Sequence, residues 1–354
     1  MIDPAAPTET GGRPADPVPG AAGGGSGTVP PVLSLRGTSR VFSTPRGEVP
    51  AVSGVELDVR PGQVLCLVGE SGCGKTTTAR MAAGLAGPTG GKVLYRGADL
   101  RGLDKRARSG FRRSVQYIHQ DPYASLNPVR TVQSTLTAGL HRHGSVKGGA
   151  QARRAAAALL ERVDLVPAED HLDKYPHQLS GGQRQRVAVA RALAMEPEVV
   201  IADESTSMLD VSVRISLLNT LGALREDLGV GFLFITHDLA VAKYFAWDGE
   251  IAVMYLGRIV EQGPAPAIVN DPRHPYTRAL VSAVCEPDPD LARTKERVRL
   301  RGADIPDPTD LPSGCDFHPR CPLYEQGRCD TERPPLVESG GRRSLACHVV
   351  NGAG

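Results

Sequence analysis

The sequence contains a phosphate-binding loop, and this motif specifies chemistry more directly than any other. Residues 69–76 read Gly-Glu-Ser-Gly-Cys-Gly-Lys-Thr and match the pattern G-x-x-x-x-G-K-[ST]. Glycines let backbone N–H groups curve around phosphates, and the helix expected next adds the positive end of its dipole. We expect Lys75 to reach the β and γ phosphates of a nucleotide and the Thr76 hydroxyl to bind Mg2+. The predicted phosphate-contacting residues are Gly69, Glu70, Ser71, Gly72, Cys73, Gly74, Lys75, Thr76 and Thr77.

Two carboxylates follow a predicted strand elsewhere in the chain. Asp203 and Glu204 come directly after residues 199–202, an apolar run of strand length. Taken alone, an acidic pair after a strand usually begins a solvated loop. With a phosphate loop in the same chain, Asp203 is suited to hold Mg2+ and Glu204 to polarise the attacking water. The two motifs together predict nucleotide hydrolysis.

A second glycine-rich segment, Leu-Ser-Gly-Gly-Gln at residues 179–183, lies about a hundred residues after the phosphate loop. Ser180 suits a helix N-cap, and the two glycines allow a ligand to approach the backbone closely. In isolation, Ser180-Gly181-Gly182 would predict an ordinary helix start. Because a compact domain has no obvious use for two anion sites, we interpret this pentapeptide as half of a site that another subunit completes.

Apolar runs and helix-forming segments alternate along the chain and must position these residues. Residues 64–68, 199–202 and 232–235 are predicted to be buried strands. Residues 151–163 and 182–195 are predicted helices, rich in Ala, Arg, Leu and Gln. Buried strands alternating with helices indicate a mostly parallel sheet that is covered on both faces. The predicted fold class is therefore α/β.

Composition limits the possible functions. The 354 residues include 41 Lys and Arg against 39 Asp and Glu, a balance that gives no reason to expect a nucleic-acid partner. No apolar run approaches the roughly 18 residues of a membrane span and no secretory pattern opens the sequence, so we expect a cytosolic protein. Residues 1–30 contain almost no large apolar side chains and are predicted to form a disordered tail.

The motifs in this order resemble the ATPase subunit of an ATP-binding cassette (ABC) transporter, from about Val32 to the C-terminus. The resemblance implies a P-loop NTPase (RecA-like) core with an antiparallel β subdomain and an inserted helical subdomain at about 121–190. It implies an ABC ATPase domain at 31–262 and a C-terminal extension at 263–354. In that family, ATP and Mg2+ are sandwiched head to tail between the phosphate loop of one subunit and the pentapeptide of the other.

The same resemblance assigns roles to further residues. Gln120 is implied to touch Mg2+ or water and to sense a membrane subunit, while His237 contacts the γ phosphate. Asp210 is implied to couple the two sites. Phe42 stands where an aromatic ring stacks on adenine, with a core role as the alternative. The pentapeptide residues implied to lie at the ATP of the partner are Ser180, Gly181, Gly182 and Gln183.

Two positions depart from the usual pattern of the family. Ser205 stands where proline commonly follows the catalytic Glu204, and His119 stands where an apolar aromatic residue commonly precedes Gln120. Serine leaves the backbone beside Glu204 looser than proline would. Because every ligand-bearing side chain is present, we expect an active enzyme.

Three stretches, residues 120–128, 175–178 and 274–280, resemble importers of dipeptides and oligopeptides. That group also includes importers of oligosaccharides and nickel, so the cargo stays open. The resemblance implies a second ATPase subunit, either a copy of this chain or a different one, two multispanning permease subunits and an extracytoplasmic peptide-binding protein. It places the chain at the cytoplasmic face of the membrane. A soluble ABC ATPase acting on nucleic acid or the ribosome is the alternative, opposed by the single cassette without a coiled-coil insertion.

Four late cysteines form a separate candidate site, and they are Cys315, Cys321, Cys329 and Cys347. Their spacings of five, seven and seventeen residues are wider than the paired C-x-x-C of a zinc ribbon. Such thiols can hold a 4Fe-4S cluster, which some of the resembling importers carry in this region. Zinc, with His318 or His348 replacing a thiolate, and uncoordinated thiols are the alternatives. The remaining cysteines, expected to be structural or bystanders, are Cys66, Cys73 and Cys285.

Overall fold

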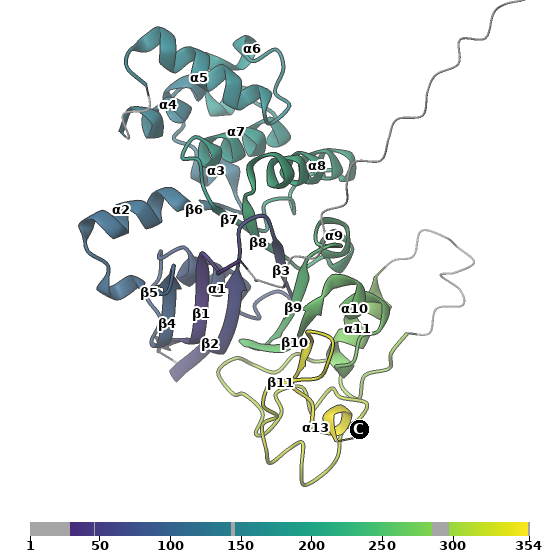
Figure 1. Cartoon of the computed structure of the whole chain (residues 1–354). Helices are drawn as coiled ribbons and strands as arrows, with labels where there is room; N and C mark the ends of the chain where they lie inside the picture. The colour runs from purple at the N-terminus through teal and green to yellow at the C-terminus, as the bar shows by residue number, and fades with distance from the viewer. Residues whose placement is uncertain (1–28, 46, 143–145, 285–296, 353–354) are drawn as a thin grey trace, which may run out of the picture.

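The computed structural model contains two β-sheets with helices packed around them (Figure 1). The residues it describes are 29–45, 47–142, 146–284 and 297–352. Nearly all of the predicted tail, and also Cys285, lie outside the described residues. Within these ranges, none of the helices combines the length and the apolarity needed to cross a bilayer.

The larger sheet has the strand order β11-β12-β10-β9-β3-β8-β7-β6. Its strands from β9 to β6 run parallel, and β10 is antiparallel to β9. The bounds are β3 Val64–Val68, β6 Val115–Ile118, β7 Val199–Asp203, β8 Gly231–Thr236, β9 Glu250–Tyr255, β10 Arg258–Pro264, β11 Val337–Glu338 and β12 Ser344–Leu345. The three strands predicted from apolar runs are β3, β7 and β8. The predicted parallel α/β sheet is thus confirmed.

The smaller sheet is antiparallel, with the strand order β2-β1-β4-β5. Its strands are β1 Leu33–Thr44, β2 Gly47–Val59, β4 Gly90–Tyr95 and β5 Ala98–Asp99. Helix α1 (Lys75–Ala82) contacts both sheets. Met81 of α1 shares a hydrophobic cluster with Leu35 of the smaller sheet and Leu65 of the larger one. This sheet is the antiparallel β subdomain that the family resemblance implies.

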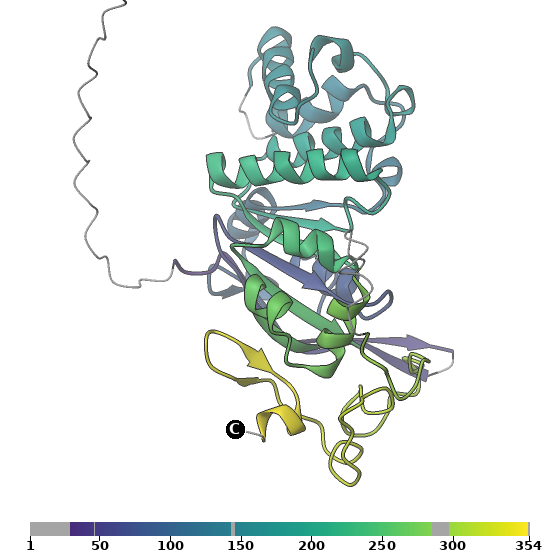
Figure 2. The same cartoon turned by 90° about the vertical axis from the view of Figure 1, so that its right-hand side faces the viewer.

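Helices α3 to α7 lie between β6 and β7 in the chain and form one end of the molecule (Figures 1 and 2). They are α3 Pro122–Ser125, α4 Val132–Arg142, α5 Gly149–Glu161, α6 Glu169–Leu172 and α7 Gly181–Leu193. The predicted helices at 151–163 and 182–195 correspond to α5 and α7, with ends shifted by one or two residues. The pentapeptide stands at the start of α7.

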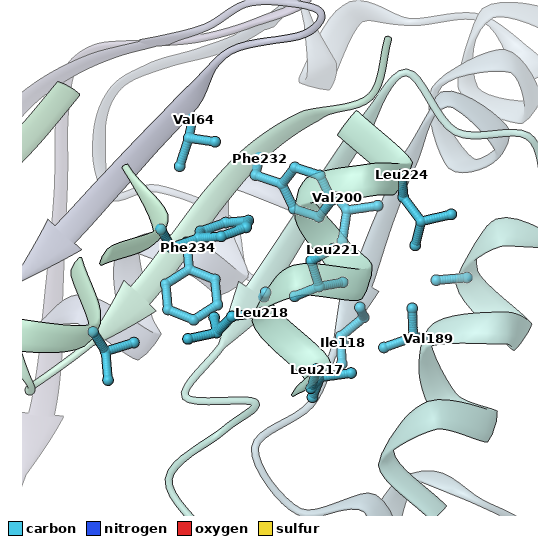
Figure 3. Close-up of a cluster of buried hydrophobic side chains, with 14 of the residues drawn as sticks. Val64, Ile118, Val189, Val200, Leu217, Leu218, Leu221, Leu224, Phe232 and Phe234 are labelled. Atoms are coloured by element: carbon cyan, nitrogen blue, oxygen red, sulfur yellow. The ribbon is translucent and has the colours of Figure 1, made fainter. Parts of the chain in front are cut away.

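Alternate residues of the parallel strands face hydrophobic clusters on opposite sides of the larger sheet. Phe232 and Phe234 of β8 pack with Leu217 and Leu221 of α8 on the side drawn in Figure 3, whereas Leu233 faces the other cluster. The remaining helices are η1 Leu100–Gly102, α2 Lys105–Ser114, η2 Pro176–Gln178, α8 Val211–Leu228, α9 Leu239–Phe245, α10 Ala265–Asn270, α11 Pro275–Ala283 and α13 His348–Asn351. With both faces covered, the loops after β3, β7 and β8 emerge together at the carboxyl edge of the sheet.

The C-terminal part of the chain is attached to the same sheet and the same core. Strand β12 pairs with β10, and the Phe317 ring is fully buried against the rings of Tyr255 and Tyr276. In both views this segment, coloured yellow-green to yellow, lies opposite the end formed by α4 to α7 (Figures 1 and 2). It is therefore packed against β10 and β9, and β9 pairs with β3, the strand that precedes the phosphate loop.

Candidate nucleotide-binding and hydrolysis site

The phosphate loop connects β3 to α1 and is held by its own backbone. The Lys75 Nζ donates to the carbonyl oxygens of Gly69 and Glu70, each at 2.8 Å. An added Cβ at Gly69 would lie 2.2 Å from the Met254 carbonyl oxygen, so the loop packs directly on β9. The other predicted residues of the loop are Ser71, Gly72, Cys73 and Gly74, and Thr77 lies in the first turn of α1. The Lys75 ammonium thus lies within the curve of the loop, where phosphates bind.

Asp203 ends β7 next to the start of α1. Its Oδ1 accepts a hydrogen bond from the Thr76 Oγ1 at 3.1 Å, and its Oδ2 accepts one from the Tyr117 hydroxyl at 2.6 Å. Burial raises the pKa of the Asp203 carboxyl, while the hydrogen bonds from Tyr117 and Thr76 act against that rise. A carboxylate and a hydroxyl side by side are oxygen ligands that suit Mg2+, which keeps several waters when bound. The structure therefore brings together Thr76 and Asp203, two of the three predicted magnesium ligands, while Gln120 is bonded to Glu204.

Three predicted catalytic side chains meet at Glu204. Its Oε2 accepts from the Gln120 Nε2 at 3.1 Å, and its Oε1 lies 3.4 Å from the His237 Nδ1. The Glu204 backbone has φ 44°, a left-handed conformation that is strained for a residue with a side chain. Its N–H donates to the Ile235 carbonyl oxygen at 3.0 Å, and its own carbonyl accepts from the Ser207 hydroxyl at 2.9 Å. These contacts hold the carboxylate facing the histidine and the glutamine.

The two departures from the family pattern have local explanations. The Ser205 side chain is buried. The hydrogen bonds of the Glu204 N–H and carbonyl constrain the backbone here, as a proline at position 205 would. The His119 ring packs edge to face on Tyr117, with 4.7 Å between ring centroids. Burial and the nearby Arg191 lower the pKa of His119, which favours the neutral form of the ring. In this setting His119 packs as an aromatic side chain would.

The pentapeptide occupies a different part of the surface. The Ser180 Oγ accepts from the Gln183 N–H at 3.2 Å, and the Gln183 Oε1 accepts from the Ser180 N–H at 2.9 Å. This capping box starts α7 and leaves the glycines at the helix N-terminus. Gly181 and Gly182 line a cavity together with Asp210, whereas residues 70–73 of the phosphate loop line another. The structure thus does not bring the two glycine-rich segments of one chain together.

The Phe42 ring is 39 % exposed near the end of β1, with the Arg40 guanidinium 4.9 Å from its centroid. This exposure excludes the core role that was its alternative. Sequence reasoning missed Tyr117, the donor to Asp203. Its place in β6, three residues before Gln120, was the available signal.

The four C-terminal cysteines are free thiols close to one another. Burial, together with the negative charge of the neighbouring thiolates, raises the pKa of the Cys315 thiol to about 12 and that of Cys321 to about 11. Among the described side chains, however, no group of three or more His, Cys, Asp or Glu residues is arranged to hold a metal ion. The cysteines converge, but as they lie they do not form the predicted metal site.

Comparison with known families matches the chain in two segments. Residues 52–207 match the family described as ABC transporter. Residues 260–329 match the oligopeptide/dipeptide transporter C-terminal region. The first match spans the phosphate loop, the pentapeptide and the acidic pair, and the second spans α11 and the first three of the late cysteines.

Individual relatives agree with these matches. The chain is 46% identical over 308 residues to a probable peptide ABC transporter ATP-binding protein of Sinorhizobium fredii, covering 87% of this chain and 85% of the relative. It is 43% identical over 307 residues to the dipeptide transport ATP-binding protein DppF of Escherichia coli, covering 87% and 89%. A solved dimeric ATP-binding cassette in a post-hydrolysis state, bound to ADP and Pi, is similar with 27% identity and a TM-score of 0.59, covering 66% of this chain and 98% of that one.

Proposed function

The chain belongs to the ABC transporter family and is an ATPase of that family, and we propose that its ATP site is completed by the pentapeptide of a second ATPase subunit. The separation of the two glycine-rich segments carries this proposal. Gly72 lines one cavity and Gly182 another, and we infer that the pentapeptide contacts a nucleotide held by another subunit. The similar cassette solved as a dimer supports such pairing. The partner is a second copy of this chain or a related chain.

Binding uses the side of the site built on α1 and β7. ATP lies along the phosphate loop, and its β and γ phosphate oxygens replace the loop carbonyls as partners of the Lys75 ammonium. Thr76 and Asp203 hold Mg2+, which supplies positive charge to the phosphates when bound. The exposed Phe42 ring stacks on the adenine.

Hydrolysis uses the residues that meet at Glu204. Its carboxylate accepts a proton from the attacking water, which Gln120 and His237 orient from either side. Asp210 lies beside the pentapeptide and links the chain's two half-sites. Closure of two subunits around ATP moves the attached membrane subunits, and hydrolysis resets them.

The Glu204→Gln variant tests the hydrolytic role. It keeps the shape and the hydrogen-bonding capacity of the side chain but removes the base, so ATP binding should persist while turnover falls about 100-fold or more. Glu226→Gln, an exposed change on α8, is the matched control and should keep wild-type turnover. Near-normal turnover of Glu204→Gln would show that another group is the base.

The chain powers the import of peptides across the cytoplasmic membrane. Both the names of the relatives and the match to the oligopeptide/dipeptide transporter C-terminal region support this cargo. The complex then contains two membrane permease subunits and receives peptide from an extracytoplasmic binding protein. The chain lies at the cytoplasmic face as a peripheral subunit.

A groove beside β6 is the docking surface that we assign to a cytoplasmic segment of the permease. It has a volume of about 660 Å³ and is lined by apolar Leu85 and Leu100 and by Tyr117 and His119. Leu85 is 59 % exposed although it is a large apolar side chain. Because Tyr117 also donates to Asp203, an occupant of the groove contacts a residue bonded to the magnesium-binding carboxylate. The groove therefore connects the membrane subunits to the ATP site.

Leu85→Asp tests this docking surface. A carboxylate on the wall of the groove should abolish co-purification with the permease subunits and peptide uptake, while ATP binding by the isolated chain stays unchanged. Leu228→Asp, which alters another exposed leucine at the end of α8, is the matched control. Retention of the permease by Leu85→Asp would place the docking surface elsewhere.

We also propose that the four late cysteines hold a 4Fe-4S cluster. This proposal is supported by the closeness of the thiols to one another. Other thiols of the set lie near enough to Cys315 and Cys321 to raise the pKa of each. A cluster binds thiolates and would remove the cost of their mutual repulsion. The thiols must shift from their present positions to do so.

Iron and acid-labile sulfide measured on anaerobically purified protein test the cluster. The expected result is both elements in the stoichiometry of one cluster per chain. A Cys329→Ser variant should lose them, while Cys66→Ser, a change in β3, should retain them. Zinc in place of iron, or four thiols titratable without metal, would contradict the cluster.

A further inference from the structure

Glu70 of the phosphate loop is held by three partners at once. Its carbonyl oxygen accepts from the Lys75 Nζ at 2.8 Å, inside the loop. Its N–H donates to the Tyr276 hydroxyl at 3.0 Å. Its carboxylate accepts two hydrogen bonds from the Arg320 guanidinium, at 2.9 and 3.1 Å. Two of these three partners belong to the C-terminal part of the chain, which lies outside the segment matched to the ABC transporter family.

The Arg320 contact has the features of a positioning contact. The guanidinium is 7 % exposed, and its two parallel bonds to one carboxylate fix the direction of the Glu70 side chain. Its Nη1 also lies 3.4 Å from the Tyr255 hydroxyl at the end of β9. The Arg320 N–H donates to the Phe317 carbonyl oxygen at 3.0 Å, so the backbone that carries the side chain is itself fixed. A buried bidentate pair of this kind depends strongly on geometry.

Tyr276 is placed by an aromatic cluster at the start of α11. Its ring centroid lies 4.6 Å from that of Tyr255 and 5.4 Å from that of Phe317. The His274 Nδ1 accepts from the Tyr276 N–H at 3.1 Å and caps the helix. The His-Pro-Tyr stretch therefore places a buried hydroxyl where it accepts a hydrogen bond from the loop backbone.

A second stretch of the C-terminal part also faces the loop. Residues 305–308 and the loop residues Glu70, Ser71 and Gly72 line the same cavity, of about 410 Å³. Glu70 is shared by this cavity and the ion pair. The C-terminal part thus lies beside the loop at residues 305–308 as well as binding Glu70.

We propose that Arg320, together with Tyr276, is a positioning residue for the phosphate loop, so that the C-terminal segment sets the affinity of the site for MgATP. Arg320 acts through Glu70, whose carbonyl also accepts from Lys75, and it touches no reacting atom. Loss of the ion pair leaves the partly exposed Glu70 carboxylate and its stretch of loop without a fixed position. The inference rests on the proposed ATP site.

The test measures the equilibrium Kd for MgATP and, separately, kcat and KM. Arg320→Ala should raise Kd and KM about fivefold or more, the usual lower range for energetic coupling, with kcat at saturating ATP changing far less. Arg320→Lys should recover part of the affinity, because an ammonium can bind one carboxylate oxygen but not bridge two. Tyr276→Phe keeps the ring packing, removes only the hydroxyl and should also raise Kd.

Arg333→Ala is the matched control, since Arg333 pairs with the buried Asp316 in the same segment at 2.8 Å but is not bonded to the loop. It should leave Kd unchanged. Glu70→Gln combined with Arg320→Ala should weaken binding no more than either change alone, because both break one contact. A wild-type Kd in both Arg320→Ala and Tyr276→Phe overturns the inference, as does an equal rise in Arg333→Ala. Failure of the wild-type chain to bind MgATP would instead overturn the proposed function.

Discussion

The phosphate loop and the pentapeptide at residues 179–183 are both glycine-rich segments that precede a helix, yet their surroundings differ. An added Cβ at Gly69 or at Gly74 would lie 2.2 Å from a backbone carbonyl oxygen of the chain's own strands. An added Cβ at Gly181 would meet nothing within 4 Å. Gly69 and Gly74 are therefore required by the packing of this chain, whereas nothing in the packing around Gly181 requires a glycine there.

The phosphate loop is a half-site whose parts are in place within one chain. We call the pentapeptide the unfinished half-site, because we propose that the nucleotide it contacts is held by another subunit. The phosphate loop has its lysine, its magnesium ligands and its backing strands in place within a single chain. The pentapeptide has its capping box, and an added Cβ at Gly182 would lie 2.7 Å from the Val213 side chain, but Gly181 at the N-terminus of α7 faces open space. A small residue facing open space is expected where another surface must approach closely. Substitution of glycines in each segment tests this difference.

The largest effect is expected for Gly69→Ala. Its methyl group collides with the Met254 carbonyl oxygen, so the loop or β9 must move, at a cost of about 1–3 kcal/mol in unfolding free energy. MgATP binding should be lost and the melting temperature lowered. Gly110→Ala, at an open glycine within α2, is the control and should keep MgATP binding, with a melting temperature that is unchanged or raised because alanine favours a helix. Unchanged binding in Gly69→Ala would mean that the loop is less tightly backed than the distances indicate.

Gly181→Ala should produce a smaller and opposite pattern. Alanine fits the open space and favours a helix, so the free energy of unfolding should stay constant or rise by up to about 1 kcal/mol. ATPase turnover of the assembled complex should nevertheless fall about tenfold or more, because the methyl group enters the space of the partner's nucleotide. Full turnover with raised stability would assign Gly181 to an ordinary helix start.

Tyr117→Phe should give the smallest effect, a shift in pH dependence. The Tyr117 hydroxyl stabilises the charged form of Asp203, so its removal raises the pKa of that carboxyl further above its usual range. Mg2+ binding needs the carboxylate, and the acidic limb of the ATPase profile should therefore move to higher pH. Tyr95→Phe, which removes a hydroxyl bonded to Ser114 away from the site, is the control. An unmoved acidic limb in Tyr117→Phe would remove the hydrogen bond from the account of Asp203.

Much of the fold and the catalytic pairings could be predicted because their signals are local. The strand before the phosphate loop and the strand before Asp203 are short, continuous apolar runs, which a buried parallel sheet requires. Parallel strands present their carboxyl ends at one edge, and this brings Thr76 to Asp203 and Gln120 to Glu204. The family resemblance then supplied the roles of these side chains.

The residues that sequence reasoning missed act over long separations. Tyr117 lies 86 positions from Asp203, while Tyr276 and Arg320 lie 206 and 250 positions from Glu70. Tyr117 had one local signal, its place in β6 before Gln120, but nothing local marks the Tyr276 hydroxyl or the Arg320 guanidinium for a distant partner, because tertiary packing selects those pairs. The four cysteines show the converse. Their spacing predicted a metal site, but spacing does not determine whether thiols converge in the required arrangement.

The most direct test of the unfinished half-site uses the Ser180→Phe variant. It compares the MgATP affinity of the monomeric variant with the ATPase turnover of the complex that contains it. Thermal unfolding serves as the folding control, since loss of the N-cap costs about 1 kcal/mol. The head-to-tail arrangement predicts a wild-type Kd in the isolated variant and a complex without turnover. A rise in Kd that parallels the loss of turnover would mean that the pentapeptide completes the site of its own chain, contrary to the proposal.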